Sequence, residues 1–177
     1  SGHMSPQTTT GFLLFVIGML TIQRSDGRSA RILAGLMAGA LLIIGAGAIG
    51  CVVGGLLTKA GHDVTLVDQW PEHIETMKQR GLRLSGTCGE YTIPVKALDI
   101  HELQGVATPF EAVFVSVKSY DTEWAAQMAL AYLKQPDGVV VDFQNGINDE
   151  RVASVVGKSR CLGCVITIGA GMYEPGH

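Results

Sequence analysis

The sequence predicts an α/β protein whose sheet is mostly parallel and carries helices on both faces. Three observations lead to this fold class. Short, continuously apolar runs recur along the chain, and segments of helical character stand between them. Strands of a parallel sheet are buried on both faces and are therefore apolar throughout, and alternating strands and helices are typical of such a sheet. Finally, 23 of the 177 residues are glycine, roughly twice the usual ~7% share.

The composition excludes several classes of protein. Lys and Arg together number 13 and Asp and Glu number 16, so the net charge is −3. Nucleic acids and anionic membrane surfaces recruit basic patches, so neither is an expected partner. Charged residues make up 16% of the chain, below the usual ~25%. A disordered chain and a charge-rich coiled coil are thereby excluded, and a folded globular domain remains.

The first part of the chain precedes the expected domain. Residues 1–4 (SGHM) resemble the remnant of a cleaved expression tag, and residues 5–38 form an extension of unknown role. The apolar run 12–22 has 11 residues, whereas a membrane span needs about 20. Residues 32–57 are apolar for longer, but their seven glycines favour a strand, a turn and a helix. The domain is therefore expected to cover residues 39–177, without a membrane segment.

The first elements of the domain carry its most specific pattern. Residues 40–44 are continuously apolar and form the first expected strand. They run into a glycine-rich turn, GAGAIG, and residues 51–60 then have helical character up to Gly61. A second apolar strand, 63–68, ends in Asp68. This order is typical of a dinucleotide-binding unit, so the expected fold is a Rossmann-type doubly wound sheet.

Each glycine of the turn has its own physical task. Gly45 permits a tight turn, Gly47 allows the backbone to touch a pyrophosphate, and Gly50 allows close packing of helix on strand. Asp68 follows Gly50 by 18 residues, close to the ~20 expected for the acid that binds the adenosine ribose. Dinucleotide binding is therefore favoured over a chance glycine cluster or a membrane GxxxG motif. The predicted cofactor-binding residues here are Gly45, Ala46, Gly47, Ala48, Ile49, Gly50 and Asp68.

The remaining elements continue the alternation of strands and helices. Pro71 is a good first residue for a helix and Gly81 a good last one. The elements expected after Asp68 are a helix at 71–80, a β-hairpin of 82–86 and 90–95, a strand at 112–117, a helix at 122–133 that Asp121 or Thr122 caps, a strand at 139–143, a helix at 148–156 that Asn148 caps and Gly157 ends, and a strand at 162–168.

The four cysteines do not indicate a disulfide scaffold in a chain of this length. Cys161 and Cys164 have CxxC spacing, but they lie in an expected strand, where residues three apart point to opposite faces. A redox site needs a helix N-terminus, and a zinc site needs a second ligand pair. Inert thiols in a reducing cytoplasm are therefore expected, with no metal site.

Two further strand ends carry polar residues. Lys118 follows the strand at 112–117, and Asn145 follows the strand at 139–143. Ligands of doubly wound sheets lie beyond the carboxyl ends of strands. A solvated loop lysine and a simple Asn-Gly turn are the alternatives, but the shared sheet edge favours a binding site.

At this point the sequence resembles the ketopantoate reductase (2-dehydropantoate 2-reductase) family. The resemblance covers roughly residues 40–177 and corresponds to that family's N-terminal cofactor-binding domain. It rests on the segments GAGAIG ending at Gly50, VTLVD ending at Asp68, GLRLSG ending at Gly86, VSVKSYDT ending at Thr122, QNGIN ending at Asn148, and EPG ending at Gly176.

The resemblance implies an oxidoreductase of pantothenate biosynthesis that reduces a 2-oxo acid to a 2-hydroxy acid, usually with NADPH. It implies that Lys118 and Asn145 contact cofactor and substrate, and that Gly169 lines the nicotinamide side. The family's general-acid lysine and substrate-binding glutamate belong to a helical second domain, which we expect to be absent from this chain. No catalytic residue is therefore assigned here, and the chain alone is expected to be inactive.

The residues after the second strand bear on the choice between NAD and NADP. Asp68 can accept hydrogen bonds from both ribose hydroxyls of NAD, but it would repel the 2′-phosphate of NADP. Gln69 and Trp70 follow, and neither is cationic. The local residues thus favour NAD, whereas the family favours NADPH. The alternative is that Asp68 turns away and caps the helix that starts at Pro71, which leaves room for a phosphate bound by an arginine of the extension, such as Arg24 or Arg28.

Other functions stay open at this stage. A related hydroxyacid dehydrogenase would have the same first domain. A stand-alone dinucleotide-binding module without turnover belongs to a different class, and the expected lack of a general acid favours it. The expected partners are a nicotinamide dinucleotide and a small 2-oxo acid, and a homodimer is possible.

Overall fold

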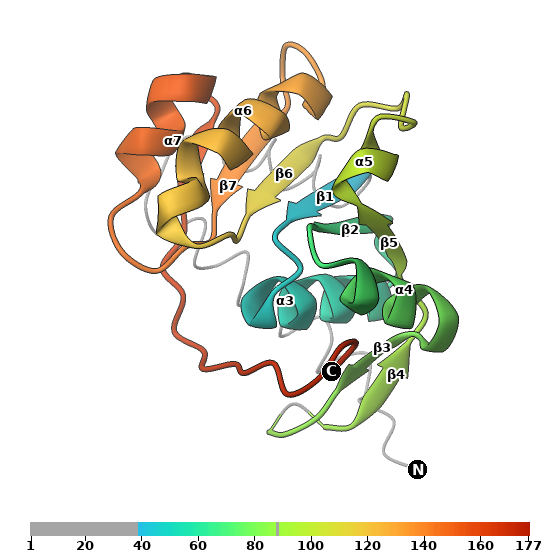
Figure 1. The fold of residues 1–177 in the computed structure, drawn as a ribbon. Coiled ribbons are helices and arrows are strands. Elements are labelled where there is room, and N and C mark those ends of the chain that lie inside the picture. The colour runs from blue at the N-terminus through green and yellow to red at the C-terminus, as the bar shows by residue number, and fades with distance from the viewer. Residues whose placement is uncertain (1–38, 88) are drawn as a thin grey trace.

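The computed structural model describes residues 39–87 and 89–177. Its main sheet has six strands in the order β5-β2-β1-β6-β7-β8, and every neighbouring pair is parallel (Figure 1). In chain order this is 3-2-1-4-5-6, the doubly wound arrangement. The strands are β1 (Leu41–Ile44), β2 (Val64–Asp68), β5 (Lys96–Asp99), β6 (Ala112–Val115), β7 (Val139–Asp142) and β8 (Cys161–Gly163).

Helices cover both faces of the sheet, as the sequence predicts (Figure 1). One face packs against α3 (Ala48–Lys59), α4 (Pro71–Arg80) and the antiparallel hairpin of β3 (Leu82–Leu84) and β4 (Tyr91–Ile93). The other face packs against α5 (Ile100–Leu103), α6 (Thr122–Tyr132) and α7 (Asp149–Val156).

The central strands are apolar because both of their faces are covered. In β1, Leu41 and Ile43 belong to the core on the α3 side, and Leu42 and Ile44 belong to the core on the α6 side. All four side chains are at most 1% exposed. Residues 39–57 of the long apolar stretch thus form a strand, a turn and part of a helix. Within the described part of the chain, no helix has both the length and the apolarity of a membrane span.

The structure departs from the expected elements in three places. The last strand is shorter than predicted, since β8 covers only Cys161–Gly163 and residues 164–177 run on without strand pairing. Strand β5 and the short helix α5 were not predicted. Asn148 and Asp121 occupy the N-cap positions of α7 and α6, but neither side chain makes a capping hydrogen bond, so that part of the prediction is wrong. The tag remnant, the extension 5–38 and Cys88 lie outside the described residues.

Candidate functional site

The glycine-rich loop between β1 and α3 adopts a shape that only glycine permits at two positions. Gly45 has φ of +96°, in the region that other residues rarely adopt. A Cβ at Gly50 would lie 2.1 Å from the Gly45 carbonyl oxygen, so the first turn of α3 can approach the end of β1 only with glycine here. The amide groups of Gly45 and Ala46 both donate to the Val67 carbonyl of β2, at 2.9 and 3.1 Å. The loop is therefore held between the first two strands.

Gly47 differs from these two glycines. It is the N-cap residue of α3, has φ of −74°, and a Cβ built there would meet no atom within 4 Å. The fold itself therefore does not require glycine at this position. The open space lies where the positive end of α3 presents backbone amide groups, a favourable position for an anion.

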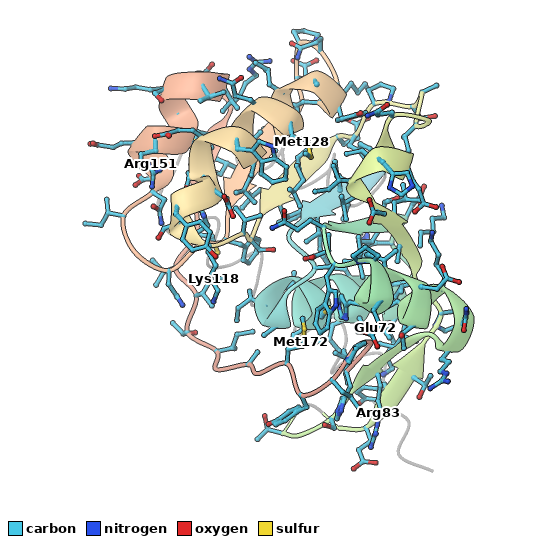
Figure 2. All side chains as sticks on the ribbon, viewed as in Figure 1. Glu72, Arg83, Lys118, Met128, Arg151 and Met172 are labelled. Carbon is cyan, nitrogen blue, oxygen red and sulfur yellow. The ribbon has the colours of Figure 1, made fainter. Side chains whose placement is uncertain are left out.

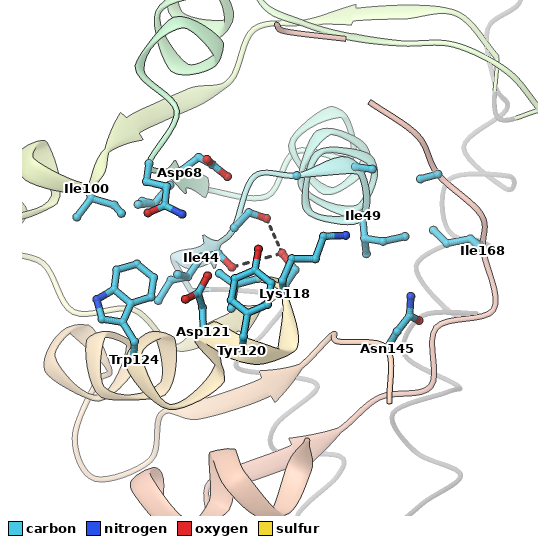
Figure 3. A pocket seen from close by; sticks show the side chains of 18 of the residues that line it. Ile44, Ile49, Asp68, Ile100, Lys118, Tyr120, Asp121, Trp124, Asn145 and Ile168 are labelled. Carbon is cyan, nitrogen blue, oxygen red and sulfur yellow. Dashed lines mark hydrogen bonds between the residues drawn. The ribbon is translucent and has the colours of Figure 1, made fainter. Parts of the chain in front are cut away.

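A cavity of about 360 Å³ lies beyond the carboxyl ends of the strands, at the point where the strand order reverses between β1 and β6 (Figure 3). This is where ligands of doubly wound sheets bind, and the volume falls within the range of small-molecule sites. Eight of the predicted site residues line it, namely Gly45, Gly47, Ala48, Ile49, Asp68, Lys118, Asn145 and Gly169. Ala46 and Gly50 belong to the same glycine-rich segment, but they are buried and do not line the cavity.

Asp68 ends β2 with its carboxylate at the wall of the cavity (Figure 3). Its Oδ1 accepts a hydrogen bond of 3.1 Å from the backbone amide of Trp70, the N-cap residue of α4. Its Oδ2 accepts none from the described residues. One oxygen therefore contacts the turn before α4 and the other remains available. Trp70, the N-cap residue, has no side-chain capping hydrogen bond, so the alternative in which Asp68 turns away to cap α4 is wrong. Arg24 and Arg28 lie outside the described residues.

Lys118 follows β6 and begins a short 3₁₀ turn (Ser119–Asp121) that leads into α6 (Figure 2). Its ammonium group has no ion-pair partner or hydrogen bond among residues 39–87 and 89–177. The loop before it is anchored by Ser116, whose hydroxyl donates to the Gly45 carbonyl at 2.6 Å. Lys118 is thus a cation with no partner in the part of the chain that the structure describes, on a loop that is joined directly to the glycine-rich turn.

Asn145 lies on the next loop, after β7, and two polar side chains position it. The Gln144 side-chain amide donates to the Val117 carbonyl at 2.9 Å, and its oxygen accepts from the Thr122 hydroxyl at 3.1 Å. The side chain of Asn148 donates to the Asn145 carbonyl at 3.0 Å. These contacts join the loops of Lys118 and Asn145 into one rim.

Arg151 of α7 strengthens the same rim from outside (Figure 2). Its guanidinium donates to the Ser119 carbonyl at 2.6 Å and to the carboxylate of Glu123 at 3.0 Å. The arginine lowers the pKa of Glu123, because it stabilises the charged carboxylate. The 3₁₀ turn after Lys118 is therefore fixed on both sides.

Several residues of the cavity were not predicted. Trp124 and Ile100 lie at one end, away from Asn145 and Ile168, and Lys118 lies between these ends (Figure 3). Trp124 is 43% exposed, on the first turn of α6. Sequence spacing gave no signal for this pair, because α5 and α6 belong to different parts of the chain.

Three buried or partly buried acids and thiols have shifted pKa values. Burial and, secondarily, Asp68 raise the pKa of the Cys51 thiol to about 12. Burial and Asp142 raise the pKa of Cys164 to about 11, so both thiols stay protonated at neutral pH, as expected of unreactive cysteines. Burial raises the pKa of Asp142, at the end of β7, to about 6. Within the described residues, no group of three or more His, Cys, Asp or Glu side chains could hold a metal ion.

Comparison with known proteins identifies the family of this chain. Residues 41–177 match the family model described as ketopantoate reductase PanE/ApbA. The chain belongs to the ketopantoate reductase family. It is 36% identical over 137 residues to the 2-dehydropantoate 2-reductase of Pyrococcus horikoshii and 38% identical over 140 residues to that of Archaeoglobus fulgidus. These matches cover 77% and 76% of this chain, but 42% of each relative, so the chain spans less than half of their length.

Solved structures give the same assignment of fold. A PanE/ApbA family ketopantoate reductase from Ralstonia eutropha superposes with a TM-score of 0.69 at 31% identity, covering 78% of this chain and 45% of that one. The ternary structure of D-mandelate dehydrogenase with NADH and anilino(oxo)acetate superposes with a TM-score of 0.68 at 25% identity, covering 77% and 44%. The ketopantoate reductase resemblance and the Rossmann-type fold are thus confirmed.

Proposed function

We propose that this chain is the cofactor-binding part of an oxidoreductase that reduces a 2-oxo acid with a nicotinamide dinucleotide. One observation carries the proposal: a single cavity at the switch point of the sheet is lined by the glycine-rich loop, Asp68, Lys118 and Asn145. Membership of the ketopantoate reductase family supports the same reaction. The bound dinucleotide would supply the hydride, and the protein residues would bind and orient the two reactants.

The residues present fit a dinucleotide along the length of the cavity. The open space at Gly47, against the N-terminus of α3, suits the diphosphate. Asp68 is positioned to accept from the adenosine ribose, and the apolar end at Trp124 and Ile100 suits the adenine. The nicotinamide end would then lie toward Asn145 and Gly169.

The charges around the cavity favour NAD over NADP. Asp68 and Asp121 both line it, and Lys118 is the only cation among the described lining residues. A ribose 2′-phosphate beside Asp68 would place like charges together, whereas the hydroxyl of NAD can donate to the free Oδ2. The NADH-bound D-mandelate dehydrogenase shows that a structural neighbour uses the non-phosphorylated cofactor.

Lys118 and Asn145 are the residues that we assign to the substrate side. An unpaired ammonium group can hold the carboxylate of a 2-oxo acid or a phosphate of the cofactor, and a side-chain amide can orient the reacting carbonyl. The curated relatives make 2-dehydropantoate the first substrate to test. A hydroxyacid dehydrogenase is the second candidate, because D-mandelate dehydrogenase is structurally similar to a comparable degree.

Calorimetry tests the cofactor part of this proposal, and a spectrophotometric assay tests the reaction. NADH, NADPH and ADP are titrated into the protein, and NADH is expected to bind tighter than NADPH. Oxidation of NADH is then followed with 2-dehydropantoate and with the 2-oxo acid of mandelate. Absence of NADH and NADPH binding would refute the proposal. Binding without turnover of either acid is the result expected of this chain alone, because no general acid is assigned to it, and rapid turnover would show that one of its own residues donates the proton.

A further inference from the structure

His73 is a buried imidazole that lies against the glycine-rich loop without lining the cavity. It is 1% exposed, in the first turn of α4. The ring of Trp70 stacks on it, with ring centroids 5.4 Å apart and planes inclined by 18°. A buried polar side chain must find hydrogen-bond partners to be tolerated. The partners of His73 come from two segments that are distant in the sequence.

The two ring nitrogens have opposite partners. Nε2 lies 2.9 Å from the carbonyl oxygen of Ala46, which can only accept, so Nε2 must carry the proton. Nδ1 accepts a hydrogen bond of 2.8 Å from the backbone amide of Gly176. This pair of partners assigns the neutral Nε2–H tautomer.

The Ala46 carbonyl is held by a second donor. The thiol of Cys51, in the first turn of α3, donates to the same oxygen at 2.9 Å. Its raised pKa keeps that proton on the sulfur at neutral pH. On the other side of the same residue, the Ala46 amide donates to Val67 of β2. Both backbone groups of Ala46 are therefore hydrogen-bonded from the protein side of the loop, which restricts the conformations open to its neighbours Gly45 and Gly47.

Gly176 belongs to residues 164–177, the segment that follows β8. The Gly176 carbonyl accepts from the Arg83 amide of β3 at 2.8 Å, and His177 contacts the Ser85 hydroxyl at 2.7 Å. The same segment lines the cavity at Gly169 and Ala170. His73 is thus a direct connection between the loop on one side of the cavity and the segment that closes its other side.

We propose that His73 is a positioning residue for the dinucleotide diphosphate, because its imidazole fixes the Ala46 carbonyl of the glycine-rich loop to the Gly176 amide of the C-terminal segment. The proposal rests on the proposed function, since it assumes that this loop binds a diphosphate. It assigns no contact between His73 and the cofactor. Its effect is to hold the amide groups around Gly47 in the orientation that an anion requires.

Binding of ADP and of adenosine to two variants tests this role. His73→Phe keeps a ring for the stack on Trp70 but removes both ring nitrogens. The buried Gly176 amide then loses its partner and the Ala46 carbonyl keeps only the weak thiol donor of Cys51, so we expect ADP affinity to fall about tenfold. Adenosine has no diphosphate, so its affinity should stay within about twofold. His73→Gln retains a donor and an acceptor and should restore ADP binding to within about threefold.

The matched control is His62→Phe, at the opposite end of α3 from the loop. It should leave both affinities unchanged. Equal losses for ADP and adenosine in His73→Phe would indicate a general structural role and would overturn the proposal. So would unchanged ADP binding in that variant. If the unaltered protein binds NADH but not ADP, only the present proposal is overturned; if it binds none of NADH, NADPH and ADP, the proposed function is overturned as well.

Nuclear magnetic resonance of the unaltered protein gives a test that does not depend on a variant folding. Long-range ¹H–¹⁵N correlations should show the Nε2–H tautomer for His73. During an ADP titration, the His73 ring and the Gly176 amide should shift with the same affinity as the Gly47 amide. An Nδ1–H tautomer, or a Gly176 amide that does not respond to ADP, would overturn the proposal.

Discussion

Alanine at Gly47 and at Gly50 should have opposite effects on folding and on ligand binding. Gly47 has dihedral angles that alanine can adopt, and a Cβ there meets nothing within 4 Å. Replacing glycine by alanine at a compatible position stabilises by about 0.4–1 kcal/mol through the unfolded chain. Losing glycine at an N-cap costs a similar amount. The two effects offset, so Gly47→Ala should leave the free energy of unfolding within about 0.5 kcal/mol of the starting value.

The same Cβ would occupy the space that we assign to the diphosphate. An extra carbon in a filled site typically costs about 1–3 kcal/mol, which corresponds to roughly 5–150-fold in affinity. Gly47→Ala should therefore fold normally and bind NADH and ADP much more weakly. Gly50→Ala instead brings a Cβ to 2.1 Å from the Gly45 carbonyl oxygen. A backbone atom cannot move aside cheaply, so this variant should lose about 1–3 kcal/mol of stability.

Circular dichroism and calorimetry distinguish these outcomes. A loss of 1–3 kcal/mol lowers Tm by roughly 2–12 °C for a chain of this size. Gly50→Ala should show that decrease, and Gly47→Ala should melt at the original temperature. If Gly47→Ala binds ADP as tightly as the unaltered protein, no diphosphate approaches this residue and the assignment of the loop is wrong.

Three further predictions concern other groups at the sheet edge. Asp68→Ala should narrow the difference between the NADH and NADPH affinities measured by calorimetry, because it removes the carboxylate that repels a 2′-phosphate. An unchanged ratio of the two affinities would mean that other groups determine the cofactor preference. The Trp70→Phe variant leaves Trp124 as the tryptophan of the described residues, at the end of the cavity that we assign to the adenine. ADP should therefore change the tryptophan fluorescence of this variant, and nicotinamide mononucleotide should not. Asp142 is 3% exposed, and burial raises its pKa from 3.8 to about 6. The folded protein therefore binds this proton more tightly than the unfolded chain does, and the free energy of unfolding should fall as pH rises from about 4 to about 6. The decrease in the free energy of unfolding is at most about 3 kcal/mol, because one pKa unit corresponds to 1.36 kcal/mol. Urea denaturation at several pH values measures this decrease, and it should be absent in Asp142→Asn.

The strand, glycine-rich turn and helix at the start of the domain were predictable because their signals are local. A continuously apolar run identifies β1, and the positive φ of Gly45 and the close approach at Gly50 each require glycine. Helix α4 was equally clear, since Pro71 begins it and Gly81 ends it. In each case, a stereochemical requirement is met by one residue at one position.

The missed elements depend on partners that are distant in the sequence. Strand β5 has only four residues with mixed exposure, and its pairing with β2 defines it. Helix α5 is short, but its capping box of Asp99 and Glu102 was a usable signal. The predicted extent of the last strand was too long, because an apolar run alone does not supply a neighbouring strand; the Cys164 amide still donates to the Asp142 carbonyl, but β8 ends at Gly163.

The site residues, too, divide into those that local sequence signals predicted and those that only distant contacts bring together. Asp68, Lys118 and Asn145 follow apolar strands, so the general rule for doubly wound sheets was enough to bring them together. Trp124 and Ile100 come together only through the packing of α5 and α6 on one face of the sheet. His73 gave no signal, because a histidine on the buried face of a helix does not reveal which backbone groups it contacts.

Asp68 lines the cavity and does not cap α4, although one of its oxygens contacts the turn that leads into that helix. A carboxylate has two oxygens, and in this structure Oδ1 accepts from the Trp70 amide while the side chain still lines the cavity. The contact to Trp70 restricts rotation of the carboxylate, which would otherwise lose conformational freedom when a ligand binds. The bond to the Trp70 amide therefore restricts Oδ2 to an orientation in which, under the proposed function, it would accept from a ribose hydroxyl. We therefore propose that the hydrogen bond that supports this turn also favours NAD, because it holds the Asp68 carboxylate at the wall of the cavity.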